Sequence, residues 1–384
     1  MARRRGRGPR RHRGGRAVTL LPSQQRLIAA MPRPAAPEAL AAALARLEAI
    51  SLAAILRVLI EQRALVAETG RDAAAVAAAL GAAPRHVWLI GRWLAVLAAR
   101  GLIAHDARGY RRAAETAPEV ATEALDAAYA ALGFPPGMAG LHRLALGHLV
   151  DLARDRTGLP ELVFRNGGDL ADLGAYQRNH FTAALNAVCA ELVALRPRRV
   201  VELGAGLGHT TEAVRARLGA LPPDYLFTDV SRLFTLAAER RHGVDTALLD
   251  IDRDPREQGR APGSAALVLA TNVLHNAVDA VRALTHIRTL LAPGGWLVFS
   301  ESVDDSAATL GAMQFLLSPA PGAPRPGSGD ERAREGRVFL DTAGWRRALE
   351  GAGLAIHSIL PEEDDPLALA GQRLFIAQAS EESA

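Results

Sequence analysis

The stretch VVELGAGLGHTT, residues 200–211, reads as a short aliphatic strand that runs into a glycine-rich turn and then into a helix. Gly204 and Gly206 allow backbone conformations that other residues avoid, and they let a ligand approach the main chain closely. The helix that begins near His209 offers unpaired backbone amides to the same ligand. Because plain tight turns also use a G-x-G-x-G pattern, the surrounding sequence must decide what binds there.

Downstream of this stretch, short aliphatic runs alternate with amphipathic segments. Such alternation is typical of a mostly parallel sheet that is covered by helices on both faces and binds its ligand beyond the carboxyl ends of the strands. The sequence therefore predicts an open α/β sheet. We expect its strands near residues 200–201, 225–227, 247–249, 266–269, 296–299, 355–360 and 374–377.

Acidic residues stand at the ends of the strands around the glycine turn. Asp229 ends the second strand, where its carboxylate can accept hydrogen bonds from both hydroxyls of a ribose. Asp250 closes the third strand beside Ile251, in position for an adenine amino group. Glu202, at the mouth of the turn, repels phosphate and suits a cationic ligand such as an amino acid. Any one of these acids alone could equally cap a helix, but together they favour S-adenosylmethionine over a dinucleotide.

Several phrases of the sequence also carry a resemblance to a known family. These phrases are ELGAGLG at 202–208, YLFTDVS at 225–231, LDIDRDP at 249–255, TNVLHNA at 271–277 and LLAPGGWLV at 290–298. They resemble class I methyltransferases and, more narrowly, the methyltransferase domains of polyketide and nonribosomal peptide synthases. The segment VFRNGG at 163–168, followed by Tyr176 and Asn186, is similar to the entry segment of those domains, so the match covers about residues 160–380.

The resemblance implies a Rossmann-like class I methyltransferase sheet with S-adenosylmethionine as its cofactor. In that family the carboxylates that match Asp229 and Asp250 bind the ribose and the adenine. Gly208 and Asn272 complete the cofactor-binding set that we predict, and Tyr176 is a candidate substrate contact. No metal ligand is expected.

Methyl transfer from a sulfonium is an in-line displacement, so the enzyme must align its acceptor and supply a base when the acceptor is a poor nucleophile. His275 lies just past the fourth strand and Glu301 just past the fifth. In the usual order of this fold these strands are neighbours, about 4.8 Å apart, so both side chains can meet over the cleft. A carboxylate beside an imidazole fixes its tautomer and raises its basicity. The resemblance implies that the pair removes the α-proton of a β-ketoacyl thioester, whereas a histidine that only caps the following helix is the alternative.

Residues 36–115 have the pattern of an α-helical winged-helix-like domain. Asp72 can cap a helix that ends near Leu80, a turn leads into a second helix through Arg100, and two short extended pieces follow. The second helix is largely apolar and holds two tryptophans, so it suits packing or dimerisation better than a DNA groove. A homodimer through this domain is therefore one expected arrangement, and a nucleic-acid partner is not expected.

The other domain boundaries follow from composition. Residues 1–16 contain eight arginines and no acid, which leaves 37 basic against 41 acidic residues in the remainder, and we expect residues 1–35 to be a disordered Arg-rich tail. Residues 116–180 read as a helical linker and substrate-cover segment, and residues 181–384 as the domain that binds S-adenosylmethionine. Residues 306–337, which we call the lid segment, are expected to cover the acceptor.

The whole-chain composition, with 49% apolar and 22% charged residues, is that of a soluble globular protein. No apolar run approaches the roughly 20 residues that cross a bilayer, so we expect a cytoplasmic protein without a membrane partner. Cys189 is the single cysteine, which excludes a disulfide or a multi-cysteine metal site within one chain.

The sequence thus predicts an S-adenosylmethionine-dependent methyltransferase of secondary metabolism. The acceptor would be an acidic carbon of a β-ketoacyl-like chain, as a small molecule or bound to a carrier protein. A small-molecule O-methyltransferase is the alternative, because a His–acid pair deprotonates a hydroxyl equally well. A winged-helix DNA-binding regulator with a ligand-sensing α/β domain is the alternative from another class. Since no carrier-protein, ketosynthase or adenylation segment is evident, we expect a free-standing or trans-acting enzyme.

Overall fold

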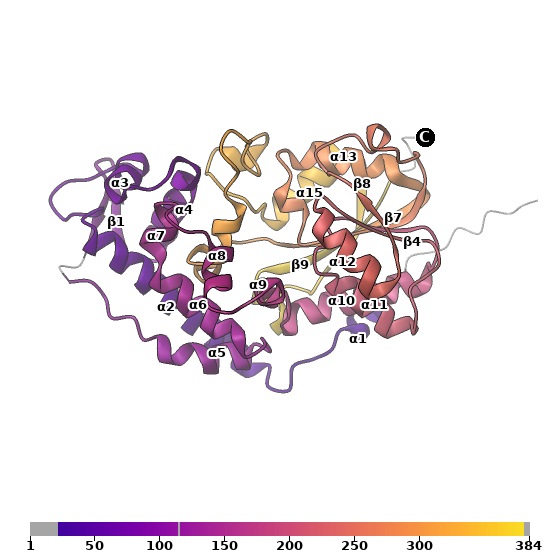
Figure 1. Cartoon of the computed structure of the whole chain (residues 1–384), viewed down its shortest axis with the longest axis horizontal. Coiled ribbons are helices and arrows are strands. Elements are labelled where there is room, and N and C mark those ends of the chain that lie inside the picture. The colour runs from indigo at the N-terminus through magenta and orange to yellow at the C-terminus, as the bar shows by residue number, and fades with distance from the viewer. Residues whose placement is uncertain (1–21, 114–115, 380–384) are drawn as a thin grey trace, which may run out of the picture.

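The structure of the protein is a computed structural model, and it describes residues 22–113 and 116–379 (Figure 1). Two parts lie side by side along the longest axis. One is built from the helices between residues 38 and 165, and the other surrounds a sheet formed after residue 199. The orange segment that follows residue 302 lies between the two parts in Figure 1.

In the described chain the main sheet has seven strands, and each overlaps a predicted one. They are β3 Val200–Glu202, β4 Tyr225–Asp229, β5 Asp245–Leu248, β6 Ala265–Thr271, β7 Leu291–Ser302, β8 Leu354–Leu360 and β9 Gln372–Ala379. Their order is β5-β4-β3-β6-β7-β9-β8, and β9 alone runs antiparallel to the other six. The strand order reverses at β3, so a ligand crevice is expected beyond its carboxyl end. The predicted α/β fold is confirmed.

The central strands are almost entirely apolar because both faces of the sheet are buried there. In β6, Leu267 and Leu269 belong to the core on one face, whereas Val268 and Ala270 belong to the core on the other. This explains why the strands read as continuous aliphatic runs and not as alternating ones. Among the helices that follow residue 179, α10 His180–Leu195, α11 His209–Leu218 and α12 Arg232–His242 contribute to the first core, and α13 Ala280–Leu290 and α15 Thr342–Gly351 contribute to the second.

The elements predicted for the N-terminal domain are present. The helix α3, Ala73–Leu80, begins at Asp72, whose Oδ1 accepts a hydrogen bond from the backbone of Ala75 at 2.7 Å. The second helix, α4, spans Val87–Ala99, and the hairpin of β1 Ile103–Asp106 and β2 Gly109–Arg112 follows it. The helix–turn–helix and hairpin thus occur in the predicted order, and the winged-helix assignment stays a prediction.

The remaining helices of this part contact α2, Glu38–Glu61, either directly or, for the last two, through α6. They are α5 Leu125–Ala131, α6 Gly137–Gly147, α7 Leu149–Ala153, α8 Leu159–Arg165 and α9 Leu170–Leu173. By length and composition α2 could cross a membrane, so the expectation that no apolar run is long enough was wrong. Half of its apolar window is buried inside the protein.

The predicted tail over residues 1–35 ends earlier than expected. Helix α1, Gln24–Ala30, packs against α10, and Arg26 forms an ion pair of 2.7 Å with Glu191. Leu27 is buried, because the apolar side of this short helix covers the core of the sheet domain. Residues 1–21 lie outside the described chain, so the prediction for the arginine run itself is not addressed.

Helix α4 packs against the lid segment of the same chain. Trp93 donates a hydrogen bond of 3.0 Å to the backbone oxygen of Leu310, and Trp88 donates one of 3.0 Å to the hydroxyl of Ser318. Both acceptors belong to the lid segment, whose short helix α14 spans Ala307–Leu310. Within α4 only Val87 and Ala99 are exposed, so the helix has no free side to read a DNA groove. These contacts provide the expected packing role, and dimerisation through this domain stays a prediction.

Candidate active site

The glycine turn after β3 is held open by backbone geometry and by one carboxylate. Gly204 and Gly206 have φ of 53° and 54°, where side chains with a Cβ are strained. A Cβ on Gly204 would lie 2.1 Å from Cγ2 of Val273, so no larger residue fits there. Asp229 accepts hydrogen bonds from the backbone nitrogens of Gly206, at 2.9 Å, and Ser231, at 2.8 Å. Asp229 therefore fixes the turn whose main chain borders the crevice.

A cavity of about 250 Å³ lies over this turn. Its walls include Gly204 and Gly206, as predicted, together with Asn272 and Tyr176. His209, at the start of α11, also lines it, and its Nε2 is buried without a hydrogen-bond partner among the described residues. A cavity bordered by glycine backbone, with an orphaned polar nitrogen and several hydroxyl and amide groups, fits a polar nucleoside-like cofactor. The sequence analysis did not single out His209 as a ligand contact.

The other predicted cofactor residues are not part of the wall of this cavity. Gly208 is the N-cap of α11 and has φ of 77°. Asp250, two residues past β5, accepts a hydrogen bond of 2.9 Å from the backbone of Asp252, and Ile251 is buried beside it. Asp229 contacts the turn as described above. Their roles on the ribose and adenine remain predictions.

Glu202 differs from the expectation that it faces the ligand. Its side chain is buried beneath the turn, where Oε2 accepts hydrogen bonds from the hydroxyls of Thr211 and, at 2.6 Å, Tyr225. Burial raises the pKa of this carboxyl to about 7, although the two hydroxyls act in the opposite direction. The sequence showed that an acid follows β3 but not that hydroxyls on α11 and β4 would draw it inward.

The buried carboxyl predicts a pH dependence of stability. An ordinary glutamate titrates near 4.5, so between pH 4.5 and 7 the folded protein keeps a proton that the unfolded chain releases. Stability from this group therefore falls as pH rises through that window. The glutamine in Glu202→Gln does not titrate. We therefore expect the free energy of unfolding of the variant, relative to that of the wild type, to rise by about 3 kcal/mol from pH 4.5 to pH 7.

Urea denaturation at several pH values measures this difference. Glu257→Gln is the matched control, because Glu257 is an exposed glutamate in the short 3₁₀ helix Pro255–Gln258 that follows β5. The difference in free energy of unfolding between this variant and the wild type should not change over the same pH range. If the difference in free energy of unfolding between Glu202→Gln and the wild type is also independent of pH, the carboxyl of Glu202 is not protonated in the folded protein in this pH range.

His275 and Glu301 are brought together as the strand order predicts. His275 lies in a short 3₁₀ helix after β6, and Glu301 lies near the end of the neighbouring β7. Nδ1 of His275 is 2.7 Å from Oε2 of Glu301, and the backbone nitrogen of His275 donates to Oε1 at 3.2 Å. Glu301 is fully buried, so its charge is poorly solvated and is directed at one partner. The imidazole is thus held by a carboxylate and does not cap the following helix.

The position of His275 is fixed by a residue that the sequence analysis missed. Arg332, in the lid segment, is buried and donates hydrogen bonds to the backbone oxygens of His275, at 3.0 Å, and Ala277, at 2.9 Å. An ion pair of 2.7 Å with Asp330 balances its charge. The ring of Phe339 lies 5.1 Å from the imidazole ring, so the histidine is supported on several sides.

A second cavity, of about 180 Å³, contains His275 in its wall. It shares Tyr176, Asn272 and Leu316 with the first cavity, so the two meet beside the dyad. Most of its other walls are apolar side chains from both parts of the molecule. Such a site can place an apolar chain with its reactive end at the imidazole. Tyr176 lies at the junction, and its role as a substrate contact remains a prediction.

The chain is similar to several known proteins. Residues 201–297 match the family model described as a methyltransferase domain. Polyketide synthase ThaG of Burkholderia thailandensis is 35% identical over 266 residues, which are 63% of this chain and 4% of ThaG. Pyochelin synthetase PchF of Pseudomonas aeruginosa strain UCBPP-PA14 is 29% identical over 368 residues, 90% of this chain and 20% of PchF. The chain therefore spans only a small part of these relatives.

A solved structure extends the similarity to almost the whole chain. The crystal structure of the CurJ carbon methyltransferase has a TM-score of 0.76 and 25% identity, and the match covers 93% of this chain and 96% of that one. The similarity includes the N-terminal helices as well as the sheet. On its fold and on these matches, the chain is a class I S-adenosylmethionine-dependent methyltransferase that resembles the methyltransferase domains of polyketide and nonribosomal peptide synthases.

Proposed function

We propose that the protein methylates the α-carbon of a β-ketoacyl-like acceptor, with His275 as the base and Glu301 as the residue that orients it. The observation that carries this proposal is the contact of 2.7 Å between Nδ1 of His275 and the fully buried Glu301, in the wall of an apolar cavity. Because Nδ1 is occupied, Nε2 is the ring nitrogen left for a substrate proton.

The chemistry follows from the position of this pair. The α-carbon of a β-ketoacyl chain lies between two carbonyls and is therefore acidic enough for an imidazole to remove its proton. The proton moves to Nε2, and the carboxylate of Glu301 stabilises the imidazolium that forms. S-adenosylmethionine, when bound, supplies the electrophilic methyl group. The apolar walls around His275 exclude water that would otherwise return a proton to the carbanion.

The relatives support a carrier-bound acyl chain as the acceptor. ThaG is a polyketide synthase, PchF is a pyochelin synthetase, and the CurJ structure is that of a carbon methyltransferase. From the CurJ carbon methyltransferase we infer that carbon is also the acceptor atom of this chain. An apolar cavity also suits the tail of an acyl chain better than a charged acceptor.

The test is to incubate the protein with S-adenosylmethionine labelled with carbon-13 in the methyl group and with two acceptors. One is a β-ketoacyl pantetheine thioester, and the other is a phenol of similar size. We expect the label on the α-carbon of the thioester, identified by the chemical shift of a carbon-bound methyl group. An α,α-dimethyl thioester, which has no α-proton, is the matched control and should stay unlabelled. Label on oxygen would overturn the proposal in favour of O-methylation.

A further inference from the structure

A second buried histidine, distant in sequence from the dyad, takes part in a chain of hydrogen bonds between three helices. It joins Ser51 of α2, His142 of α6 and Tyr129 of α5, all of them buried. Ser51 Oγ is 2.7 Å from the backbone oxygen of Leu47 and 3.3 Å from Nε2 of His142. Nδ1 of His142 is 2.7 Å from the hydroxyl of Tyr129. The proposed reaction does not use these groups.

The donor and the acceptor of each of these hydrogen bonds can be derived. A carbonyl oxygen only accepts, so Ser51 donates its single hydrogen to Leu47. Burial lowers the pKa of His142 to about 4, so its ring is neutral near pH 7 and carries one N–H. Ser51 has no hydrogen left for the ring, and Nε2 must therefore be the donor. Nδ1 is then an acceptor, and Tyr129 donates its hydroxyl hydrogen to it.

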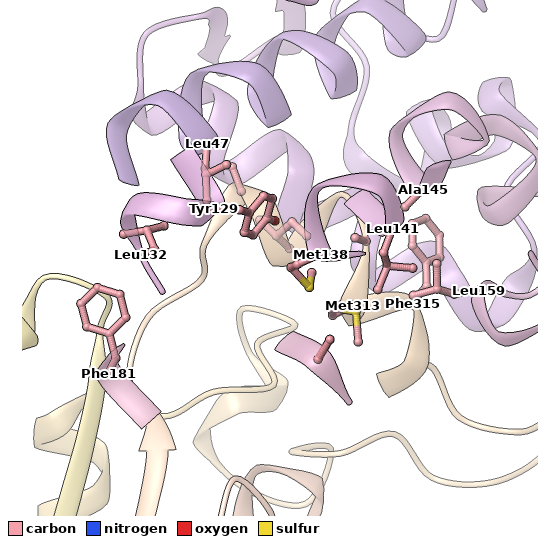
Figure 2. Close-up of a cluster of buried hydrophobic side chains, with 14 of the residues drawn as sticks. Leu47, Tyr129, Leu132, Met138, Leu141, Ala145, Leu159, Phe181, Met313 and Phe315 are labelled. Carbon is pink, nitrogen blue, oxygen red and sulfur yellow. The ribbon is translucent and has the colours of Figure 1, made fainter. Parts of the chain in front are cut away.

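The phenol oxygen of Tyr129 is consequently left with lone pairs and no hydrogen. Tyr129 lines the same cavity as His275, and its neighbours in that wall include Leu47, Leu132 and Met138. Figure 2 shows these side chains together in one buried apolar group. A group with fixed polarity in an apolar wall discriminates between ligands, because a mismatched ligand leaves it unpaired.

We propose that Tyr129 is a specificity-determining residue that accepts a hydrogen bond from a hydroxyl on the acyl chain of the acceptor. This inference rests on the proposed function only in that the cavity holds the acyl chain. A hydroxyl brings the hydrogen that the phenol oxygen lacks. A ketone at the same carbon has lone pairs but no hydrogen to donate, and a methylene has neither. Both compounds should therefore bind more weakly than the hydroxyl compound.

The experiment compares binding within sets of β-ketoacyl pantetheine thioesters that share one chain length. Each set contains three compounds, which carry a hydroxyl, a ketone or a methylene at one carbon beyond the β-position. Different sets vary different carbons of the acyl chain. Calorimetry in the presence of S-adenosylhomocysteine measures affinity without any reaction. At one position we expect the hydroxyl compound to bind about tenfold more tightly than the other two. Tyr129→Phe should remove this preference and leave the affinity for the saturated chain unchanged.

Tyr110→Phe is the matched control, because Tyr110 lies in the hairpin, stacked on His105 at 4.0 Å. It should retain the full preference. The ratio of affinities is the deciding quantity, since a merely structural loss weakens all three compounds alike. Equal affinities in the wild type at every position, or a preference that survives in Tyr129→Phe, would overturn the inference. If the hydroxyl compound is preferred but no thioester is methylated, the inference stands and the proposed function fails.

Discussion

His275→Ala is expected to lower methyl transfer by a factor of about 10²–10⁴ and to leave the affinity for S-adenosylhomocysteine unchanged. The loss follows because Nε2 is the proposed base and no other imidazole is in the wall of the acceptor cavity that the described residues form. Cofactor affinity is retained because His275 is not in the wall of the first cavity. Turnover with a labelled methyl donor and calorimetry on the same preparation measure the two quantities separately.

Two further variants test the role of the carboxylate and serve as the control. Glu301→Gln keeps a hydrogen-bond acceptor for Nδ1 but removes the negative charge, so we expect a smaller loss of turnover than in His275→Ala. His105→Ala is the control, because that histidine lies in the hairpin of the N-terminal part. Turnover and cofactor affinity that fall together in His275→Ala would instead assign the residue a structural role.

Arg332→Met is expected to reduce the free energy of unfolding by about 3–5 kcal/mol, the range found when one partner of a buried ion pair is removed. The variant leaves the carboxylate of Asp330 without its partner and removes the donor for the backbone oxygens of His275 and Ala277. Methyl transfer should also be lost, because the loop that carries His275 loses its support. Chemical denaturation and the turnover assay measure both effects.

The matched control is Arg256→Met, whose exposed ion pair with Asp254 spans 2.6 Å. We expect no measurable loss there, because water solvates both charges. Adding Asp330→Asn to Arg332→Met should recover part of the stability, since the uncompensated charge is gone. A loss no larger than that of the control would show that Arg332 does not support the loop.

The sequence was a good guide to the sheet and to the dyad for one physical reason. Both faces of a parallel sheet are buried, so its strands are conspicuous aliphatic runs, and the residues that follow them meet at one edge. Once the strand order was assumed, His275 and Glu301 had to be neighbours, and the register of β6 with β7 bears this out. The same reasoning placed Gly204 and Gly206 at the cavity.

The residues that the sequence did not reveal act through long-range contacts in irregular segments. Arg332 lies in a stretch rich in proline, glycine and arginine, without any period from which burial could be inferred. Its partners, the carbonyls of His275 and Ala277, are backbone groups and leave no trace in the sequence. The inward turn of Glu202 was missed because it depends on hydroxyls contributed by α11 and β4.

The placement of β9 inside the sheet has a consequence for biosynthesis. β9 pairs with both β7 and β8, and Glu301 is in register with Arg373. A nascent chain therefore exposes an aliphatic, unpaired side of β7 until residue 379 has left the ribosome. Pairing between such distant segments closes slowly, because the entropy of the intervening loop is lost first. The strand that bears the dyad carboxylate is thus completed only after translation has passed it, and until then its unpaired edge is open to association with other chains.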